Sequence, residues 1–104
     1  MTTTLPELHD AVLASMTIRW EDGCTDLVVR PVSSAPQDVT LHLTGVTRIM
    51  CPRLAPWGFS RHINRVDGPI KLDEARQQLQ IEMQSGDTIE IDYLNLAILP
   101  RDPE

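Results

Sequence analysis

The side chains of His9 and Asp10 are the first in this sequence whose types could do chemistry together. Such a pair could act as a general base with its orienting carboxylate, or contribute two ligands to a metal site. Neighbouring residues of an extended chain point to opposite faces, which opposes their convergence on one ligand. A structural interpretation therefore competes, in which both side chains hydrogen-bond backbone groups at the start of the first strand.

The other residues with reactive or metal-binding side chains are isolated along the chain. His42 lies on the polar face of an expected strand and His62 in an irregular region, and their spacing indicates no shared metal site. Cys24 and Cys51 fit neither a zinc spacing nor a disulfide framework. No Ser or Cys occupies a nucleophile elbow, and the glycines do not cluster into a phosphate-binding loop. We expect no catalytic residue, no metal site and no cofactor.

A loop with two of the four aromatic residues is the second candidate site. Trp57 and Phe59 lie in the segment 51–61, which is punctuated by Pro and Gly and carries Arg53 and Arg61. Trp, Phe and Arg are enriched at the energetic centres of interfaces, and binding residues favour loops on a rigid scaffold. The competing interpretation is that both aromatic side chains fold back and close one end of the core.

Alternating residues in the last third of the chain predict an antiparallel hairpin. Residues 78–84 and 88–99 have a period of two, and a three-residue turn, 85–87, is expected to join them. This turn keeps the apolar residues on one face, whereas a two-residue turn mixes apolar and acidic residues. The expected apolar pairs are Leu79 with Tyr93, Ile81 with Ile91 and Met83 with Ile89.

The opposite face of this hairpin is acidic and is the third candidate site. The expected register aligns Glu82 with Glu90 and leaves Asp92 diagonal to Glu82. Directly opposed like charges cost stability, so such a cluster could be retained to receive a basic partner or a cation. A solvated face that discourages edge pairing is the competing interpretation.

Short alternating runs elsewhere predict an all-β fold. In the first run Met16, Ile18 and Trp20 alternate with polar residues, and a two-residue turn, 22–23, is expected to pair Arg19 with the next strand at Asp26. Further strands are expected at 25–32, 39–44, 46–50 and 61–66.

Two local features qualify this strand pattern. Gly45 could mark a β-bulge between two strands. Residues 72–80 have a helix-favouring composition but are too short to stand alone, so at most one helical turn is expected at 73–76. Six or seven strands in 104 residues imply an antiparallel β-sandwich or a small, partly open barrel built from hairpins.

Composition limits the partners and the compartment. A chain of 104 residues with 41% apolar content is expected to be one β-domain, 1–104. The net charge is −6 and the nine Lys and Arg residues are scattered, which argues against nucleic acid as a partner. No apolar stretch approaches membrane-spanning length, and no secretory signal precedes the cysteines. We therefore expect no membrane partner, reduced thiols and, by elimination, a bacterial cytoplasmic protein.

Three segments resemble a group of small uncharacterised bacterial β-proteins. They are Leu8-His9-Asp10-Ala11, which opens a hairpin, the Pro56-Trp57-Gly58 loop, and residues 81–87 with the sequence IEMQSGD. More loosely, the opening His-Asp followed by a β-meander is similar to some immunity proteins of bacterial toxin systems. That similarity implies a small, acidic, intracellular and non-enzymatic protein, and it carries over no catalytic residue.

The principal hypothesis is that the protein is a non-enzymatic protein-interaction module. A narrower version of this hypothesis is that it is an immunity protein. Its partner would be a protein with a basic surface, because the chain is acidic. The alternative hypothesis is a small-ligand-binding protein or an enzyme with a cleft near His9, Asp10 and His62. Assembly into a homodimer through exposed strand edges is a third hypothesis.

Overall fold

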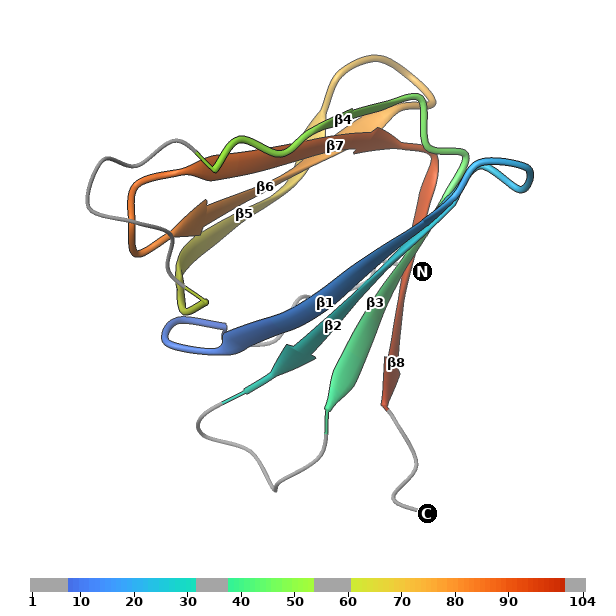
Figure 1. Ribbon diagram of the computed structural model, residues 1–104. Coiled ribbons are helices and arrows are strands. Elements are labelled where there is room, and N and C mark those ends of the chain that lie inside the picture. Colours follow the sequence, from blue (N-terminus) through green and yellow to red (C-terminus); the bar gives the residue numbers. More distant parts are fainter. Residues whose placement is uncertain (1–7, 32–37, 54–60, 101–104) are drawn as a thin grey trace.

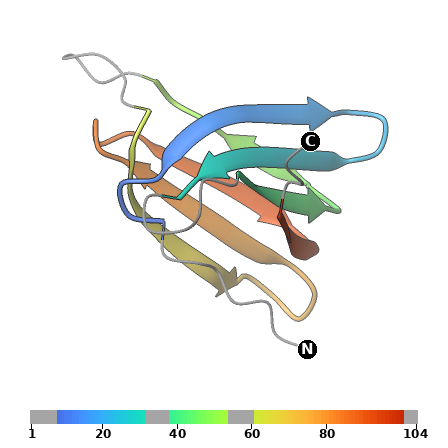
Figure 2. The same ribbon diagram turned by 90° about the horizontal axis from the view of Figure 1, so that it is seen from below.

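The computed structural model describes residues 8–31, 38–53 and 61–100, and within these ranges the chain forms eight β-strands and no helix (Figure 1). The strands build two four-stranded antiparallel sheets, ordered β1-β2-β3-β8 and β4-β7-β6-β5, which face each other without closing into a barrel (Figure 2). The predicted all-β sandwich is confirmed. The strands are β1 (Val12–Arg19), β2 (Cys24–Arg30), β3 (Val39–Thr44), β4 (Arg48–Met50), β5 (Ile63–Lys71), β6 (Gln77–Met83), β7 (Thr88–Tyr93) and β8 (Asn95–Pro100).

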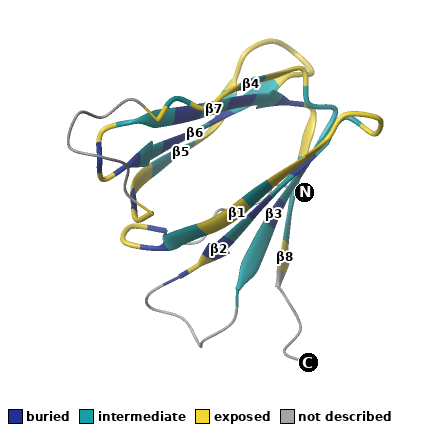
Figure 3. Cartoon of the chain, in the orientation of Figure 1, coloured by how far each residue is buried: buried dark blue, intermediate teal, exposed yellow. Residues whose placement is uncertain are grey.

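The core lies between the two sheets, where every second residue of β2, β6 and β7 is buried (Figure 3). Full burial of a Leu or Ile side chain contributes roughly 1.5–3 kcal/mol, so this alternation is the main source of stability. The predicted apolar face of the last hairpin is confirmed, because all six of its residues are buried: Leu79, Ile81, Met83, Ile89, Ile91 and Tyr93.

The turn of that hairpin begins one residue earlier than predicted. The N–H of Met83 donates to the carbonyl of Asp87 at 2.8 Å, and the N–H of Gly86 donates to the carbonyl of Met83 at 2.9 Å. The loop is therefore 84–86 rather than 85–87. Gly86 has a φ of 102° at the third loop position, where three-residue hairpin loops require a left-handed residue.

This earlier turn moves the strand register by two residues. A shift of two leaves each side chain on its face, so the apolar face survives while every pairing changes. Glu82 lies opposite Thr88, and Glu90 lies opposite Gln80. The predicted Glu82–Glu90 pair is wrong, as are the predicted apolar partners: Leu79 faces Ile91 and Ile81 faces Ile89.

The first hairpin shows the same kind of error. Arg19 pairs with Cys24 rather than with Asp26, across a four-residue loop, 20–23. The glycine that ends this loop has a φ of 67°, and its N–H donates to the carbonyl of Arg19 at 3.1 Å. The expected two-residue turn, 22–23, is wrong because the loop begins two residues earlier, at Trp20, although it still ends at the left-handed Gly23.

The turn between β5 and β6 is not helical, so the helical turn expected at 73–76 is wrong. The carboxylate of Asp73 accepts the backbone N–H of Arg76 at 2.7 Å and that of Ala75 at 2.9 Å. These bonds, the one from Arg76 foremost, hold the pKa of Asp73 below its ordinary value. A side chain that satisfies backbone donors in this way favours a tight turn over a helix.

Two chain segments pass together from one sheet to the other at a corner of the sandwich. On one side of the corner Thr44 pairs with Asn95, and on the other Arg48 pairs with Asp92. Three residues of the first segment, beginning with Gly45, therefore lie opposite two of the second. The extra residue is the bulge that the sequence indicated, and it lets β3 continue into β4 while β7 continues into β8.

Gly45 cannot be replaced without strain. It has a φ of 65°, and an added Cβ would lie 2.6 Å from Cδ1 of Leu94. Gly23 has nearly the same φ, 67°, but an added Cβ there meets nothing within 4 Å. The two glycines share the backbone requirement, and only Gly45 has the close contact.

We predict that Gly45→Ala lowers the free energy of unfolding more than Gly23→Ala does. Each substitution carries a left-handed penalty of about 1 kcal/mol, and the contact with Leu94 adds about 1–3 kcal/mol at the corner. Urea denaturation of both variants measures the difference. Equal losses would show that Leu94 moves away without cost.

The single tyrosine, Tyr93, is fully buried, and its hydroxyl has no hydrogen-bond partner among the described residues. Burial raises the pKa of this phenol above its ordinary value of 10.0. The unfolded chain therefore loses its phenolic proton at a lower pH than the folded chain. The resulting stabilisation is present below pH 10 and is lost as the pH rises through the folded pKa.

We predict that Tyr93→Phe is as stable as the wild type at pH 7, or more stable by about 1 kcal/mol, because it removes an unsatisfied buried hydroxyl. In an alkaline titration the variant should unfold at a higher pH. For the wild type, absorbance of the phenolate should appear together with the loss of circular dichroism. Ionisation near pH 10 in an intact fold would contradict the burial of this group.

Candidate functional site

The segment 8–11 is a β-turn, closed by a 3.0 Å bond from the N–H of Ala11 to the carbonyl of Leu8. Nδ1 of His9 lies 2.6 Å from the backbone carbonyl of Asn64, and Nε2 lies 3.6 Å from the carboxylate of Asp10. Because these residues sit in a turn, the expectation that their side chains point to opposite faces is wrong. The bond to Asn64 is of the kind that the structural interpretation describes.

His62 belongs to the same junction, where the start of β1 meets the start of β5. It forms an isolated β-bridge with Val12, and its carbonyl accepts the N–H of Gln84 at 2.9 Å. The side-chain amide of Gln84 donates to the carboxylate of Asp10. His9, Asp10 and His62 are thus brought together, but all three are exposed and line neither of the two cavities described below.

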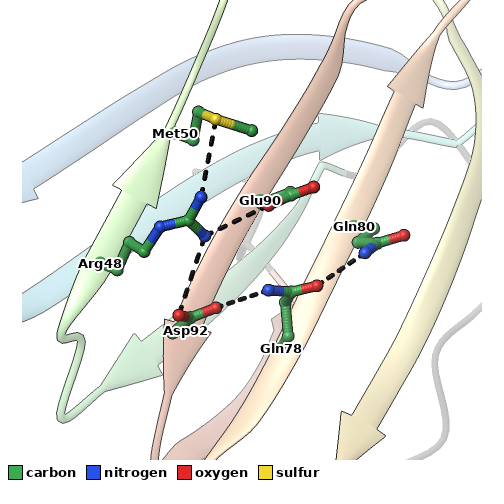
Figure 4. Close-up of polar contacts among 6 residues, drawn as sticks. All are labelled: Arg48, Met50, Gln78, Gln80, Glu90 and Asp92. Atoms are coloured by element: carbon green, nitrogen blue, oxygen red, sulfur yellow. Dashed lines mark hydrogen bonds and ion pairs between the residues drawn. The ribbon is translucent and has the colours of Figure 1, made fainter. Parts of the chain in front are cut away.

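The acidic face of β7 is paired with a basic residue from the neighbouring edge strand (Figure 4). Arg48 of β4 lies 3.2 Å from the carboxylate of Glu90 and 3.8 Å from that of Asp92. Asp92 also accepts the amide of Gln78 at 2.8 Å, and Gln78 in turn accepts that of Gln80 at 2.6 Å. These contacts tie β4, β7 and β6 together across their solvent side.

The other end of this face is paired in the same manner from β5. Arg65 lies 3.3 Å from the carboxylate of Glu82 and 3.1 Å from that of Asp67. The amide of Asn64 donates to Glu82 at 3.4 Å. The predicted acidic cluster is therefore a row of carboxylates with arginine partners on both edge strands. Sequence reasoning missed these partners because they depend on which strands flank the hairpin.

A second His–carboxylate pair joins β2 to β3. Nδ1 of His42 lies 2.5 Å from the carboxylate of Asp26, and each side chain is a little over one-quarter exposed. The two residues are direct partners in the β2–β3 ladder. Sequence analysis placed His42 on a polar face, but the register that brings Asp26 opposite follows from no turn signal. The pair lines neither cavity, and its evident effect is to tie the two strands together.

The described residues contain no group of three or more His, Cys, Asp or Glu side chains that could hold a metal ion. Across 8–31, 38–53 and 61–100 there is also no helix long and apolar enough to span a membrane.

Two cavities open between β1 and β4, each of which is an edge strand of its sheet. The smaller, about 280 Å³, is lined by residues 13–16 and 51–53 among others. The larger, about 500 Å³, is lined by residues 18–20 and 46–49 among others. We call these two cavities together the lateral groove.

The lateral groove is rich in arginine. Arg53 and Arg61 line the smaller cavity, and Arg19 and Arg48 line the larger. Four of the nine basic residues of the chain thus line the groove, together with one of its fifteen acidic residues, Asp87. The structure brings together the two arginines singled out from the sequence, whereas Trp57 and Phe59 between them lie outside the described residues.

The most exposed large apolar side chain of the described chain is at the rim of the larger cavity. Trp20 is 94% exposed and the nearby Ile18 is 51% exposed. The turn that carries Trp20 projects from one end of the sandwich (Figure 1), and the N–H of Val46 donates to the carbonyl of Gly23 at 3.0 Å. The side chain of Cys24 and then Asp22 raise the pKa of Arg19 above its ordinary value.

A comparison with known protein families finds no family model that matches this chain, and no curated protein sequence is significantly similar to it. The resemblance to small bacterial β-proteins and the looser similarity to immunity proteins stay predictions.

We predict that the contact between Arg48 and Glu90 contributes a coupling of about 0.2–1 kcal/mol, as partly exposed ion pairs do. A double-mutant cycle with Arg48→Ala and Glu90→Gln, measured by urea denaturation, gives this value. The coupling should shrink in 1 M salt, because screening acts on exposed charges. Strict additivity at low salt would mean that Arg48 and Glu90 do not stabilise each other.

Proposed function

We propose that this protein is a non-enzymatic protein-interaction module and, more specifically, an immunity protein of a bacterial toxin system. The observation that carries the proposal is Trp20, 94% exposed at the rim of an arginine-lined cavity. Trp and Arg are the residue types most enriched among side chains that dominate binding energy. Covering a tryptophan of roughly 200 Å² would contribute about 5 kcal/mol before ordering costs.

The placement of the acid–base candidates also supports a binding role. The His9–Asp10 and His42–Asp26 pairs line neither of the two cavities described here. The carboxylates of the acidic face already have arginine partners on the same sheet. We therefore place the binding surface of this proposal at the lateral groove.

A second candidate function, the binding of a small ligand, has one observation in its favour. The larger cavity, about 500 Å³, is within the size range of small-molecule sites. This site would differ from the cleft near His9, Asp10 and His62 that the sequence suggested. A ligand there would contact Trp20 and Arg48, so its binding would be visible as a change in tryptophan fluorescence.

The immunity form of the proposal predicts a toxic partner encoded beside this protein. Co-expression with the product of the adjacent gene should relieve growth inhibition, and the two purified proteins should bind in calorimetry. Trp20→Ala should weaken that binding at least tenfold, because it removes an apolar anchor. Leu72→Ala is the matched control, since Leu72 is also exposed, at 45%, but lies outside the groove.

The outcome against the proposal is equally specific. A neighbouring gene product that neither binds nor inhibits growth would remove the immunity form. Equal affinities for Trp20→Ala, Leu72→Ala and the wild type would show that the groove is not the binding surface.

A further inference from the structure

The backbone of β1 is open along the side that faces the groove. β1 is an edge strand, and its ladder partner is β2. At its start, the N–H of Leu13 donates to the carbonyl of Arg61 at 2.8 Å. From Ala14 to Ile18, no backbone hydrogen bond other than those with β2 is formed within the described part of the chain. With respect to the described residues, this stretch therefore presents the unpaired N–H and C=O groups of a strand edge.

The two edges of the opposite sheet are less suited to pairing. β4 has three residues. The ladder of β5 is irregular at two places, and Pro69 there has no N–H to donate. β5 also carries Arg65 and Asp67, an exposed charged pair of the kind that blunts strand edges. β1 has one irregularity, between Leu13 and Ser15, and is regular beyond it.

A strand added to β1 would place alternate side chains over the lateral groove. The cavities adjoin residues 13–16 and 18–20, so their centres are about four residues, or roughly 13 Å, apart along the strand. Residues four apart in a strand share a face. One extended segment could therefore fill both cavities with apolar side chains at positions i and i+4, the larger residue entering the cavity beside Trp20.

The charges around the groove specify the rest of the ligand. Four arginines and one acidic residue line the cavities, although the chain as a whole has a net charge of −6. Arg48 and Arg19 already lie 3.2 Å from Glu90 and 3.5 Å from Asp22, so an acidic ligand in the larger cavity would share these two arginines with those carboxylates. A segment with Asp or Glu between or beside its apolar residues would meet these arginines. The acidic remainder of the surface would repel the same segment elsewhere and so favour this one binding position.

We propose that the lateral groove binds an extended acidic and apolar segment of a partner protein, which adds to β1 as a fifth strand of that sheet. This inference rests on the proposed interaction function and names the chemistry of its partner. The main-chain bonds of β1 supply affinity, the two cavities select apolar side chains, and the arginines select acidic ones.

The two cysteines allow a direct test, because Cys51 lines the smaller cavity and Cys24 the larger. The probe is a synthetic eight-residue peptide with Leu and Phe four positions apart and Asp or Glu between them. The full-length chain and its Cys24→Ser and Cys51→Ser variants are treated with a maleimide, with and without peptide. At saturation, the peptide should slow alkylation of each remaining thiol at least fivefold.

Three peptide controls separate strand addition from general attraction. Lys in place of the acidic residues should abolish protection, because it opposes the arginines. Moving the apolar residues to i and i+3 puts them on opposite faces and should weaken binding at least tenfold. Methylation of alternate backbone nitrogens, which removes strand-pairing donors, should have a similar effect.

Protein variants supply the matched comparison. Arg53→Ala and Arg61→Ala should each weaken binding of the acidic peptide severalfold. Arg30→Ala should not, because Arg30, the last residue of β2, pairs with Asp38 and lies outside the groove. Protection by the i and i+3 peptide and the methylated peptide equal to that by the original peptide, or protection of neither thiol, would overturn the proposal.

Two further outcomes distinguish this inference from the function on which it rests. A protein partner that binds without protecting either thiol would leave the interaction function standing and remove the groove as its site. A dimer that forms without peptide and protects both thiols would show that a second copy of this chain occupies the lateral groove. That result would overturn the proposal of an acidic partner segment.

Discussion

The contact between Gly45 and Leu94 is the constraint on which the rest of the structure depends. It lies where two paired segments turn together from one sheet to the other. One segment runs from β3 into β4, and the other runs back from β7 into β8. Without this corner the two sheets would share no hydrogen-bonded connection on that side. The strand order that results places β4 at an edge opposite β1, and the lateral groove exists because these two edges do not pair.

The sequence predicted the buried face of this sandwich well and its registers poorly, for one physical reason. Apolar alternation reports which side of a strand is buried, and a shift of two residues leaves that side unchanged. The turns alone fix the register. The loop of the last hairpin ends at Gly86, which was predicted in the middle of its turn, whereas the loop of the first hairpin ends at Gly23 as predicted but begins two residues earlier. The apolar residues of β6 and β7 were therefore identified correctly while every facing pair was wrong.

The candidate site was harder to predict because its parts come from strands that no turn connects. Arg48 and Arg65 pair with the acidic hairpin from opposite edges of its sheet. His42 lies opposite Asp26 because of the β2–β3 register, which no turn signal in the sequence predicts. Trp20 follows the apolar alternation of β1, which argued for an inward position. It is exposed because the first hairpin extends past the end of the core.

The distribution of charge adds a local argument to the one that the net charge suggested. A net charge of −6 favours a basic partner at long range, where the protein acts as a single charge. At contact distance, attraction depends on the groups within a few ångströms, and in the groove these are mainly arginines. Carboxylates on β6 and β7 are held by arginines of their own sheet, and one of these arginines, Arg48, also lines the groove and is shared between the two. The arginines that line the groove are the local observation behind the proposal of an acidic partner segment there.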